Sequence, residues 1–255
     1  MINLKSPREI AHIRESGRLA AETLAYIAPF IKPGVSTEEL NRECHKFITQ
    51  HGAIPSPLNY HGFPKSICTS RNQVICHGIP SPKEILRDGD IINIDVTVLY
   101  EGFHGDTNKT FLVGKVDPKI QQLVRVTYDA LWAGIKAVKP QAHLNDIAYA
   151  ISGVVKPFNY GIVVDYCGHG IGRNFHEDPQ VIHAPQRQKG PKLLPGMVFT
   201  IEPMINLGRP ETKVLADDWT VETVDGLPSA QFEHTLVVTE QGYEVLTLLA
   251  NGQEP

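Results

Sequence analysis

The sequence predicts an α+β fold made of two related halves. Three observations support this prediction: helix signals come in pairs, segments with β-strand alternation follow each pair, and part of the pattern recurs at a fixed distance along the chain. The 255 residues are 42% hydrophobic and 20% charged, which is typical of a globular protein that buries its core without disulfides. We expect a single domain over residues 1–255, with halves at about 1–112 and 113–255.

Each of the four predicted helices begins at a local signal. Ser6 precedes a proline and stands three residues before a glutamate, which predicts a helix over about 7–27. Ser36 opens a second helix by the same capping logic, and this helix ends near residue 52. Asp117 and the proline after it begin a third helix that runs to about residue 138, and a fourth follows Pro140 and ends near residue 155.

Residues 91–111 alternate well enough to predict an antiparallel hairpin that turns at Glu101-Gly102. With a two-residue turn there, Asp95 lies opposite Asn108, and Asp106 becomes its diagonal neighbour on the same polar face. Two aspartates on such a hairpin more often simply belong to a polar face that is exposed to water. The alternative is a site that needs two carboxylates.

The internal recurrence favours a shared site. Six residues recur at an offset of 107: Lys32, Pro33, Leu86, Gly89, Ile94 and Asp95 reappear as Lys139, Pro140, Leu193, Gly196, Ile201 and Glu202. Related halves usually pack about a pseudo-two-fold axis, so acids on matching strands are expected to meet near that axis.

Four acids are therefore candidates for one site: Asp95, Asp106, Glu202 and Glu233. The latter two lie in runs apolar enough to be central strands. Carboxylates ~4 Å apart repel by about 4 kcal/mol per pair at an effective dielectric near 20, so buried acids need cations among them. Few lysines or arginines lie near these strands, which favours a divalent metal.

His169 lies in YCGHGIGR, where three glycines leave the backbone open around the imidazole. The same stretch also allows a thiol nucleophile at Cys167 or a phosphate loop. Both alternatives are weak, because an i, i+2 Cys–His pair seldom places the two groups usefully and the glycines do not fit a phosphate-loop pattern.

Composition narrows the function classes. A net charge of −4 provides no overall basic field for nucleic acid or anionic membranes. The four cysteines form no CxxC pair, which fits reduced thiols. The N-terminus lacks a secretory signal and no window approaches ~18 apolar residues, so we expect a cytoplasmic protein.

Five motifs together resemble the methionine aminopeptidases: NIDVTV, FHGDTNKTF, YCGHGIGR, FTIEPM and AQFEHTLVVT. The resemblance covers nearly the whole chain. It implies the pita-bread fold, in which two halves form a curved antiparallel sheet covered by helices. It also implies a dinuclear metal centre with Asp95, Asp106, His169, Glu202 and Glu233 as ligands.

The resemblance further implies how the site works. This oxygen-rich ligand set suits Co²⁺, Mn²⁺ or Fe²⁺, with Zn²⁺ as an alternative, and two such ions activate a water and polarise a carbonyl. Glu202 would also handle the proton of that water. His77 and His176 match the family's two non-ligand histidines and would bind the substrate amide and the tetrahedral intermediate.

The implied methionine pocket consists of Tyr60, Phe63, Cys68, Phe175 and Trp219, next to His77 and His176. Aromatic rings suit a thioether, although each of these residues alone is more often core packing. Pro57 stands where some relatives carry a cysteine at the pocket rim. Backbone oxygens of Asn72, Val74 and Ser229 are expected to bind one Na⁺ or K⁺.

Only 31 positions separate Glu202 from Glu233, which leaves no room for the helical insertion of type II enzymes. The sequence therefore resembles a short bacterial-type type I enzyme, which releases the N-terminal methionine of newly made proteins when the second residue is small. Two alternatives remain: a proline-specific peptidase like aminopeptidase P or prolidase, and a non-catalytic binding protein. We expect a monomer, and we favour a solvated basic loop over a transient ribosome contact at residues 187–192.

Overall fold

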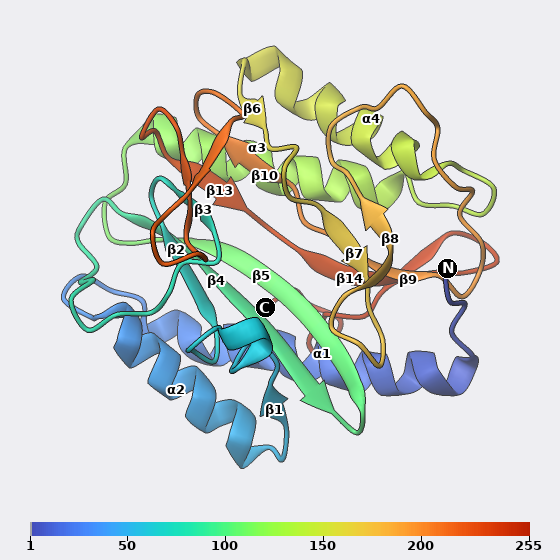
Figure 1. Cartoon of the computed structure of the whole chain (residues 1–255), viewed down its shortest axis with the longest axis horizontal. Coiled ribbons are helices and arrows are strands. Elements are labelled where there is room, and N and C mark those ends of the chain that lie inside the picture. The colour runs from blue at the N-terminus through green and yellow to red at the C-terminus, as the bar shows by residue number, and fades with distance from the viewer. Residues whose placement is uncertain (1) are drawn as a thin grey trace.

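Within residues 2–255, four α-helices lie beside a set of antiparallel strands (Figure 1). The structure is a computed structural model that describes residues 2–255. The α-helices are α1 (Pro7–Ile27), α2 (Thr37–Gln50), α3 (Pro118–Lys136) and α4 (Leu144–Val155), and the 3-10 helices are η1 (Ala28–Phe30), η2 (Tyr60–Gly62) and η3 (Lys156–Phe158). The capping boxes at Ser6 and Ser36 are present, so the predicted helix starts there are confirmed.

The strands form four small sheets, and all their pairings are antiparallel in residues 2–255. One contains β1 (Ile54–Pro55), β2 (Cys68–Arg71), β4 (Ile91–Tyr100) and β5 (Phe103–Leu112). The second contains β6 (Gly161–Ile162), β10 (Met204–Asn206) and β13 (Ser229–Gln231), and the third β3 (Val74–Cys76), β11 (Thr212–Val214) and β12 (Val221–Thr223). The largest has the order β15 (Tyr243–Val245), β14 (His234–Val238), β9 (Val198–Ile201), β7 (Gly168–Gly170) and β8 (Glu177–Val181).

The hairpin prediction is confirmed in its register. β4 pairs with β5, and Asp95 lies opposite Asn108 while Asp106 lies opposite Thr97. The two turn residues have positive φ, 49° at Glu101 and 81° at Gly102, as a tight two-residue hairpin turn requires. The local turn therefore places both aspartates on one face of the ladder.

Backbone hydrogen bonds repeat at the predicted offset. Gly34 N donates to Leu86 O, and 107 residues later Gln141 N donates to Leu193 O. Leu86 N and Leu193 N then donate to Val35 O and Ala142 O, and isolated bridges join Ser36 to Ile85 and His143 to Lys192. These matched contacts support the proposal that the chain consists of two related halves.

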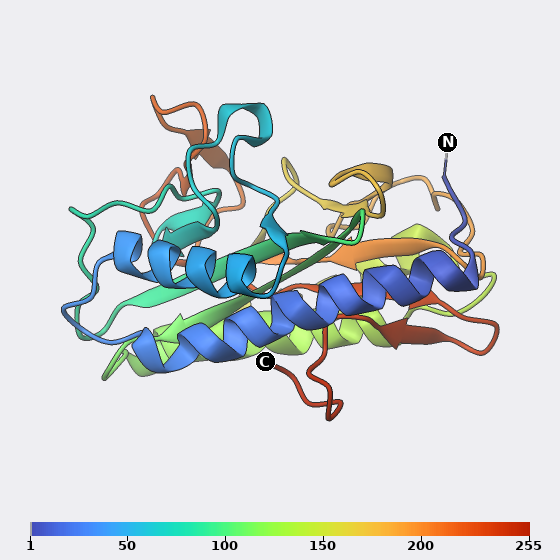
Figure 2. The same ribbon diagram turned by 90° about the horizontal axis from the view of Figure 1, so that it is seen from below.

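Each helix pair covers the strands of its own half. Leu24 and Leu40, from α1 and α2, pack in one fully buried cluster with Ile94 of β4. A second cluster joins α3 and α4 to the strands that follow them, for example through Phe199. Burying each such side chain contributes roughly 1.5–3 kcal/mol. Figure 2 shows α1 and α3 along one side of the strands and the irregular segments, including η2, on the opposite side.

Threonine side chains join the two halves between β5 and residues 231–235. Thr107 Oγ1 donates to Glu233 O at 2.7 Å, and Thr110 Oγ1 donates to Gln231 O at 2.7 Å. Thr235 Oγ1 donates to Asp106 O at 2.8 Å from the other side. This seam brings Asp106 and Glu233 together although they are far apart in the sequence.

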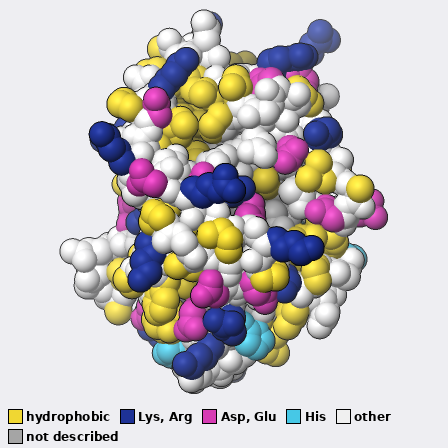
Figure 3. All heavy atoms as spheres, turned by 90° about the vertical axis from the view of Figure 1, so that its left-hand side faces the viewer, with side chains coloured by type: hydrophobic (Ala, Val, Ile, Leu, Met, Phe, Trp, Pro, Cys, Tyr) yellow, Lys and Arg dark blue, Asp and Glu magenta, His cyan; other side chains and the backbone are white. Residues whose placement is uncertain are grey.

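The surface shows no single dominant charge on the side drawn in Figure 3, where basic and acidic side chains are interspersed with apolar ones. In residues 2–255, no helix has the length and apolar character that crossing a membrane requires. The four cysteines are free thiols.

Candidate metal centre

The five predicted ligands line one cavity of about 530 Å³. Each comes from a different strand or strand end: Asp95 from β4, Asp106 from β5, His169 from β7, Glu202 directly after β9, and Glu233 between β13 and β14. The first two belong to the first half of the chain and the other three to the second. The site therefore lies where the halves meet.

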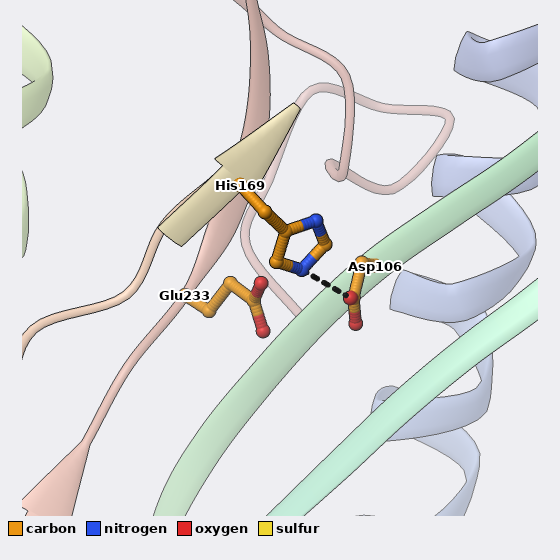
Figure 4. A group of neighbouring side chains, drawn as sticks. All are labelled: Asp106, His169 and Glu233. Carbon is orange, nitrogen blue, oxygen red and sulfur yellow. Dashed lines mark ion pairs between the residues drawn. The ribbon is translucent and has the colours of Figure 1, made fainter. Parts of the chain in front are cut away.

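Asp106, His169 and Glu233 point toward one another from three segments (Figure 4). Each offers one ligand atom, and these atoms all lie within 4.8 Å of one another. His169 Nε2 is 3.5 Å from Asp106 Oδ2 and 3.7 Å from Glu202 Oε1. The spacing leaves room for a cation between the oxygen and nitrogen atoms.

The backbone fixes which nitrogen of His169 faces the cluster. His169 Nδ1 lies 2.9 Å from Gly170 O, so Nδ1 carries a proton and Nε2 is the nitrogen directed at Asp106. The flanking glycines are needed for this approach. A Cβ on Gly168 would lie 2.4 Å from Thr200 O, and one on Gly170 would lie 2.0 Å from Asp178 O.

Hydroxyl and amide donors orient three of the carboxylates. Thr97 Oγ1 donates to Asp106 Oδ1, and Thr200 Oγ1 donates to Glu202 Oε1, both at 2.7 Å. Asn108 Nδ2 donates to Glu233 Oε2, also at 2.7 Å. At Asp106 and Glu233 the donor occupies one carboxylate oxygen, whereas Glu202 Oε2 also accepts from Gln231 Nε2 at 3.2 Å. Partners behind a metal site usually hold its ligands in this way.

Burial makes the acidic cluster unstable as a set of bare anions. It raises the pKa of Glu202 to about 7, with the Asp106 charge adding to the effect. Burial and the neighbouring acids also raise the pKa of Asp95 and of Glu233 well above the usual range. Burial opposes protonation of His169, but the hydrogen bond to Asp106 and the charge of Glu202 outweigh it and raise its pKa.

Two carboxylate oxygens show that the residues fit a cation. Asp95 Oδ1 and Glu233 Oε1 are buried and have no hydrogen-bond partner among the described residues. A buried acceptor left unpaired costs roughly 1–3 kcal/mol, and more when it is charged. A divalent cation satisfies both atoms and offsets the repulsion among the acids, and the donor set of oxygens and one imidazole nitrogen suits hard or borderline ions.

The residues predicted for the methionine pocket also line this cavity. They are Tyr60, Phe63, Cys68, Phe175 and Trp219, with Pro57 beside them. The Phe63 and Trp219 rings meet edge to face at 5.2 Å, and the Tyr60 and Phe175 rings are 4.8 Å apart. The cavity therefore has an aromatic part and an acidic part.

The two non-ligand histidines lie between these parts. The His176 ring is 4.2 Å from the His169 ring, and its Nδ1 is 2.8 Å from the Tyr60 hydroxyl. His77 is 6.3 Å from Trp219 by ring centroids. Burial lowers the pKa of His77, and that of His176 to about 4, so both are neutral at pH 7.

The residues predicted to bind a monovalent cation lie outside the residues that line this cavity. Asn72 O accepts a hydrogen bond from Ser229 N at 2.8 Å, so these two are neighbours. Val74 begins β3 next to them and pairs with Glu222. The assignment of Na⁺ or K⁺ to this place stays a prediction.

Sequence reasoning missed the residues that support the ligands. Thr97 and Thr200 each stand two positions from a predicted ligand on the same strand face, so alternation alone could have found them. His183 is fully buried, and its Nε2 accepts from Glu202 N at 3.1 Å. No sequence pattern indicates that contact, because it depends on how two separate segments pack.

Comparisons with known proteins agree with the geometry. The sequence pattern of metallopeptidase family M24 matches residues 11–240. Methionine aminopeptidase of Escherichia coli K12 is 51% identical over 256 residues, which cover 100% of this chain and 97% of that protein. The crystal structure of methionine aminopeptidase from Rickettsia prowazekii has a TM-score of 0.95 at 51% identity, covering 97% of this chain and 100% of that one.

A more distant structure shares the fold alone. Prolidase from Pyrococcus furiosus has a TM-score of 0.77 at 23% identity, covering 96% of this chain but 65% of the prolidase. Together with the closer relatives, this confirms the predicted pita-bread fold.

Proposed function

The chain belongs to metallopeptidase family M24 and, within it, to the type I methionine aminopeptidases, and from this membership we propose that it releases the N-terminal methionine of newly made proteins whose second residue is small. The observation that supports this best is one cavity that combines an acidic cluster with an aromatic and thiol-lined pocket. The acidic part suits hydrolysis and the aromatic part suits a thioether side chain.

Divalent metal is a property of the family. In our proposal two ions are held by Asp95, Asp106, His169, Glu202 and Glu233. Co²⁺, Mn²⁺ and Fe²⁺ fit these ligands, with Zn²⁺ as an alternative. When bound, such ions supply a water of lowered pKa and polarise the scissile carbonyl.

The chain's own groups manage protons and charge. Glu202 accepts the proton of the attacking water, while Thr200 Oγ1 and Gln231 Nε2 hold its two oxygens at 2.7 and 3.2 Å. The Tyr60 hydroxyl lies 2.8 Å from His176 Nδ1. In our proposal this hydroxyl donates to Nδ1, and Nε2 carries the proton of His176 and donates to the oxygen that becomes negative. His77 binds the substrate amide next to it.

The pocket selects an unbranched, polarizable side chain. Phe63, Phe175 and Trp219 surround it with ring faces and edges, and Cys68 closes it without adding a charge. Pro57 is buried at its rim, where a rigid ring replaces the thiol of some relatives. We infer that methionine enters this part of the cavity with its α-amino group toward the acidic cluster.

Further properties belong to the proposal. The substrates are N-terminal peptides, and we infer a cytoplasmic monomer that binds no DNA, with one Na⁺ or K⁺ at Asn72, Val74 and Ser229. We infer no dependence on the ribosome through Arg187, Lys189 and Lys192. The proline-specific alternative is not favoured, since relatives named methionine aminopeptidase match the whole chain at 51% identity and the prolidase at 23%.

Peptide cleavage with and without a chelator tests the function. Met-Ala-Ser should release methionine, whereas Met-Lys-Ser and Xaa-Pro peptides should not, and chelation should stop the reaction until divalent metal is returned. Preference for an Xaa-Pro bond would move the chain to the proline peptidases. Absence of turnover with every metal tried would favour a binding protein.

Glu202→Gln tests the proton acceptor. We expect turnover to fall by at least about 10³-fold with an unchanged far-UV spectrum, because the amide cannot accept the proton. Glu240→Gln, on an exposed loop, is the matched control and should leave the rate unchanged. A normal rate in Glu202→Gln would remove this residue from the mechanism.

A further inference from the structure

Strand β8 forms one edge of the five-stranded sheet. Among residues 2–255 it pairs with β7 alone, so one of its sides has no neighbouring strand. Pro179 in its middle has no N–H, and proline within a sheet is typical of an edge strand. An exposed edge is a place where an extended peptide can add as a further strand.

The orientation of β8 defines which backbone groups face this free side. In the β7–β8 ladder Gly168 lies opposite Val181 and His169 lies opposite Gln180. His169 N donates to Thr200 Oγ1 of β9 at 3.0 Å, so the backbone groups of His169 face β9 and those of its partner Gln180 face the free side of β8. Neighbouring residues in a strand direct their N–H groups to opposite sides. The N–H groups of Gln180 and Ile182 therefore face away from β7.

The free side of β8 continues from the catalytic cavity. Gln180 lines that cavity and also a second one, of about 550 Å³, whose wall includes Ile182, Gln186 and Arg187. The segment after β8 arches away toward α4 (Figure 1). The lining of the second cavity combines residues of this segment with Leu144 and Asn145 of α4. A chain leaving the catalytic cavity along β8 thus reaches the second cavity at Gln180, which borders both.

We propose that the free edge of β8 binds the substrate polypeptide beyond its second residue as an added β-strand. This inference rests on the proposed function and specifies how the rest of the substrate is held. Backbone pairing reads no side chains, which suits an enzyme whose substrates share only their first residues. The second cavity agrees, since Asn145, Gln186 and Gln188 contribute neutral amides to it and Arg187 is its one charged side chain.

The size of the effect follows from a few hydrogen bonds. One net hydrogen bond changes an equilibrium about two- to tenfold. An extended chain advances about 3.4 Å per residue, so four added residues span the length of β8 and offer two or three amides to it. A seven-residue substrate should therefore exceed Met-Ala-Ser in kcat/KM by roughly tenfold.

A scan with N-methylated peptides tests the proposal. Met-Ala-Ser is compared with Met-Ala-Ser-Ala-Ser-Ala-Ser and with versions that carry one N-methyl group at residues 3 to 7 in turn. We expect the gain from length to fall at alternate positions only, because every second amide faces β8. Equal kcat/KM for short and long peptides, or a gain that no N-methyl group reduces, would overturn the proposal.

The same series separates this proposal from the function on which it rests. Release of methionine from Met-Ala-Ser measures the activity of the catalytic site. The ratio of kcat/KM for the seven-residue peptide to kcat/KM for Met-Ala-Ser measures binding along the edge of β8. If no peptide is cleaved, the proposed function fails. Calorimetry then measures binding of the seven-residue peptide and its N-methylated versions to the metal-loaded protein. A loss of affinity at alternate N-methyl positions would still support strand addition at β8.

A variant of the chain provides a second measurement. Ile182→Pro removes an N–H on the free side, and Ile182→Val is the matched control that keeps it. The ratio of kcat/KM for the seven-residue peptide to that for Met-Ala-Ser should fall toward one in Ile182→Pro and stay unchanged in Ile182→Val. A second copy of the chain is the other candidate for this edge, and concentration-dependent dimers that Ile182→Pro abolishes would assign the edge to it and overturn the proposal.

Discussion

Replacing Lys5 by methionine should destabilise the protein through a single buried ion pair. Lys5 Nζ lies 2.5 Å from Glu177 Oε2, and the exposed fractions of the two side chains are 3% and 14%. The backbone of Lys5 is also fixed, since its N–H donates to Gly196 O at 2.7 Å. The pair thus connects the N-terminal segment to the residue that follows His176.

The magnitude depends on which charge is left behind. At an effective dielectric near 20 the attraction is roughly 6–7 kcal/mol, and desolvation of both groups cancels most of it. Removing one partner leaves an unpaired buried charge, which costs about 3–5 kcal/mol. Glu177 borders the catalytic cavity and can hydrate, so we expect about 2–3 kcal/mol for Lys5→Met and 3–5 kcal/mol for Glu177→Gln.

Urea denaturation of a double-mutant cycle measures this coupling. Lys5→Met/Glu177→Gln leaves no charge, so it should lose less stability than Glu177→Gln alone. The exposed pair Arg125–Asp129, with exposed fractions of 75% and 45%, is the control and should couple by less than about 0.5 kcal/mol. Additive losses at Lys5 and Glu177 would refute the argument.

Metal-free protein should lose stability as the pH rises from about 4.5 to 7, because burial raises the pKa of Glu202 to about 7 and ionisation in the cavity then opposes folding. The Tm gap between metal-loaded and chelated protein should therefore widen between pH 5 and 7.5, and a constant gap would contradict this. Gln141→Gly should stabilise by about 1 kcal/mol in denaturant, because Gln141 has a φ of 69°. Gly34 is the matched position in the first half, has a φ of 93° and has open space around it, so Gly34→Gln should destabilise the protein by a similar amount. Changes in stability of the same sign for the two variants would contradict this prediction. Iodoacetamide should label Cys167 first in the folded protein, because the other three thiols are buried. Mass spectrometry that finds Cys68 labelled as fast as Cys167 would contradict this prediction.

Local chemistry explains what the sequence could predict. Capping boxes and prolines fix helix starts within a few residues, and two turn residues fix the register of the long hairpin, so Asp95 and Asp106 could be placed without distant information. The recurrence at 107 residues indicated the halves, and the resemblance of five motifs supplied the ligand set that the cavity brings together.

The remaining features depend on packing between distant segments. Strands of two or three residues, such as β3, β6 and β12, are too short to show a period, and their partners lie far along the chain. The contact of His183 with Glu202 and the threonine seam arise only when two segments meet. The free edge of β8 is likewise a property of strand order, which alternation does not encode.

The pairing of β12 with β3 joins the two halves beside the binding pocket. Val221 of the second half pairs with Cys76 of the first, and Trp219 and His77 both lie just beyond this pair, at the same end of the ladder, with ring centroids 6.3 Å apart. Backbone pairing thus joins the two halves directly beside these two rings, so the register of the two strands sets the spacing between them.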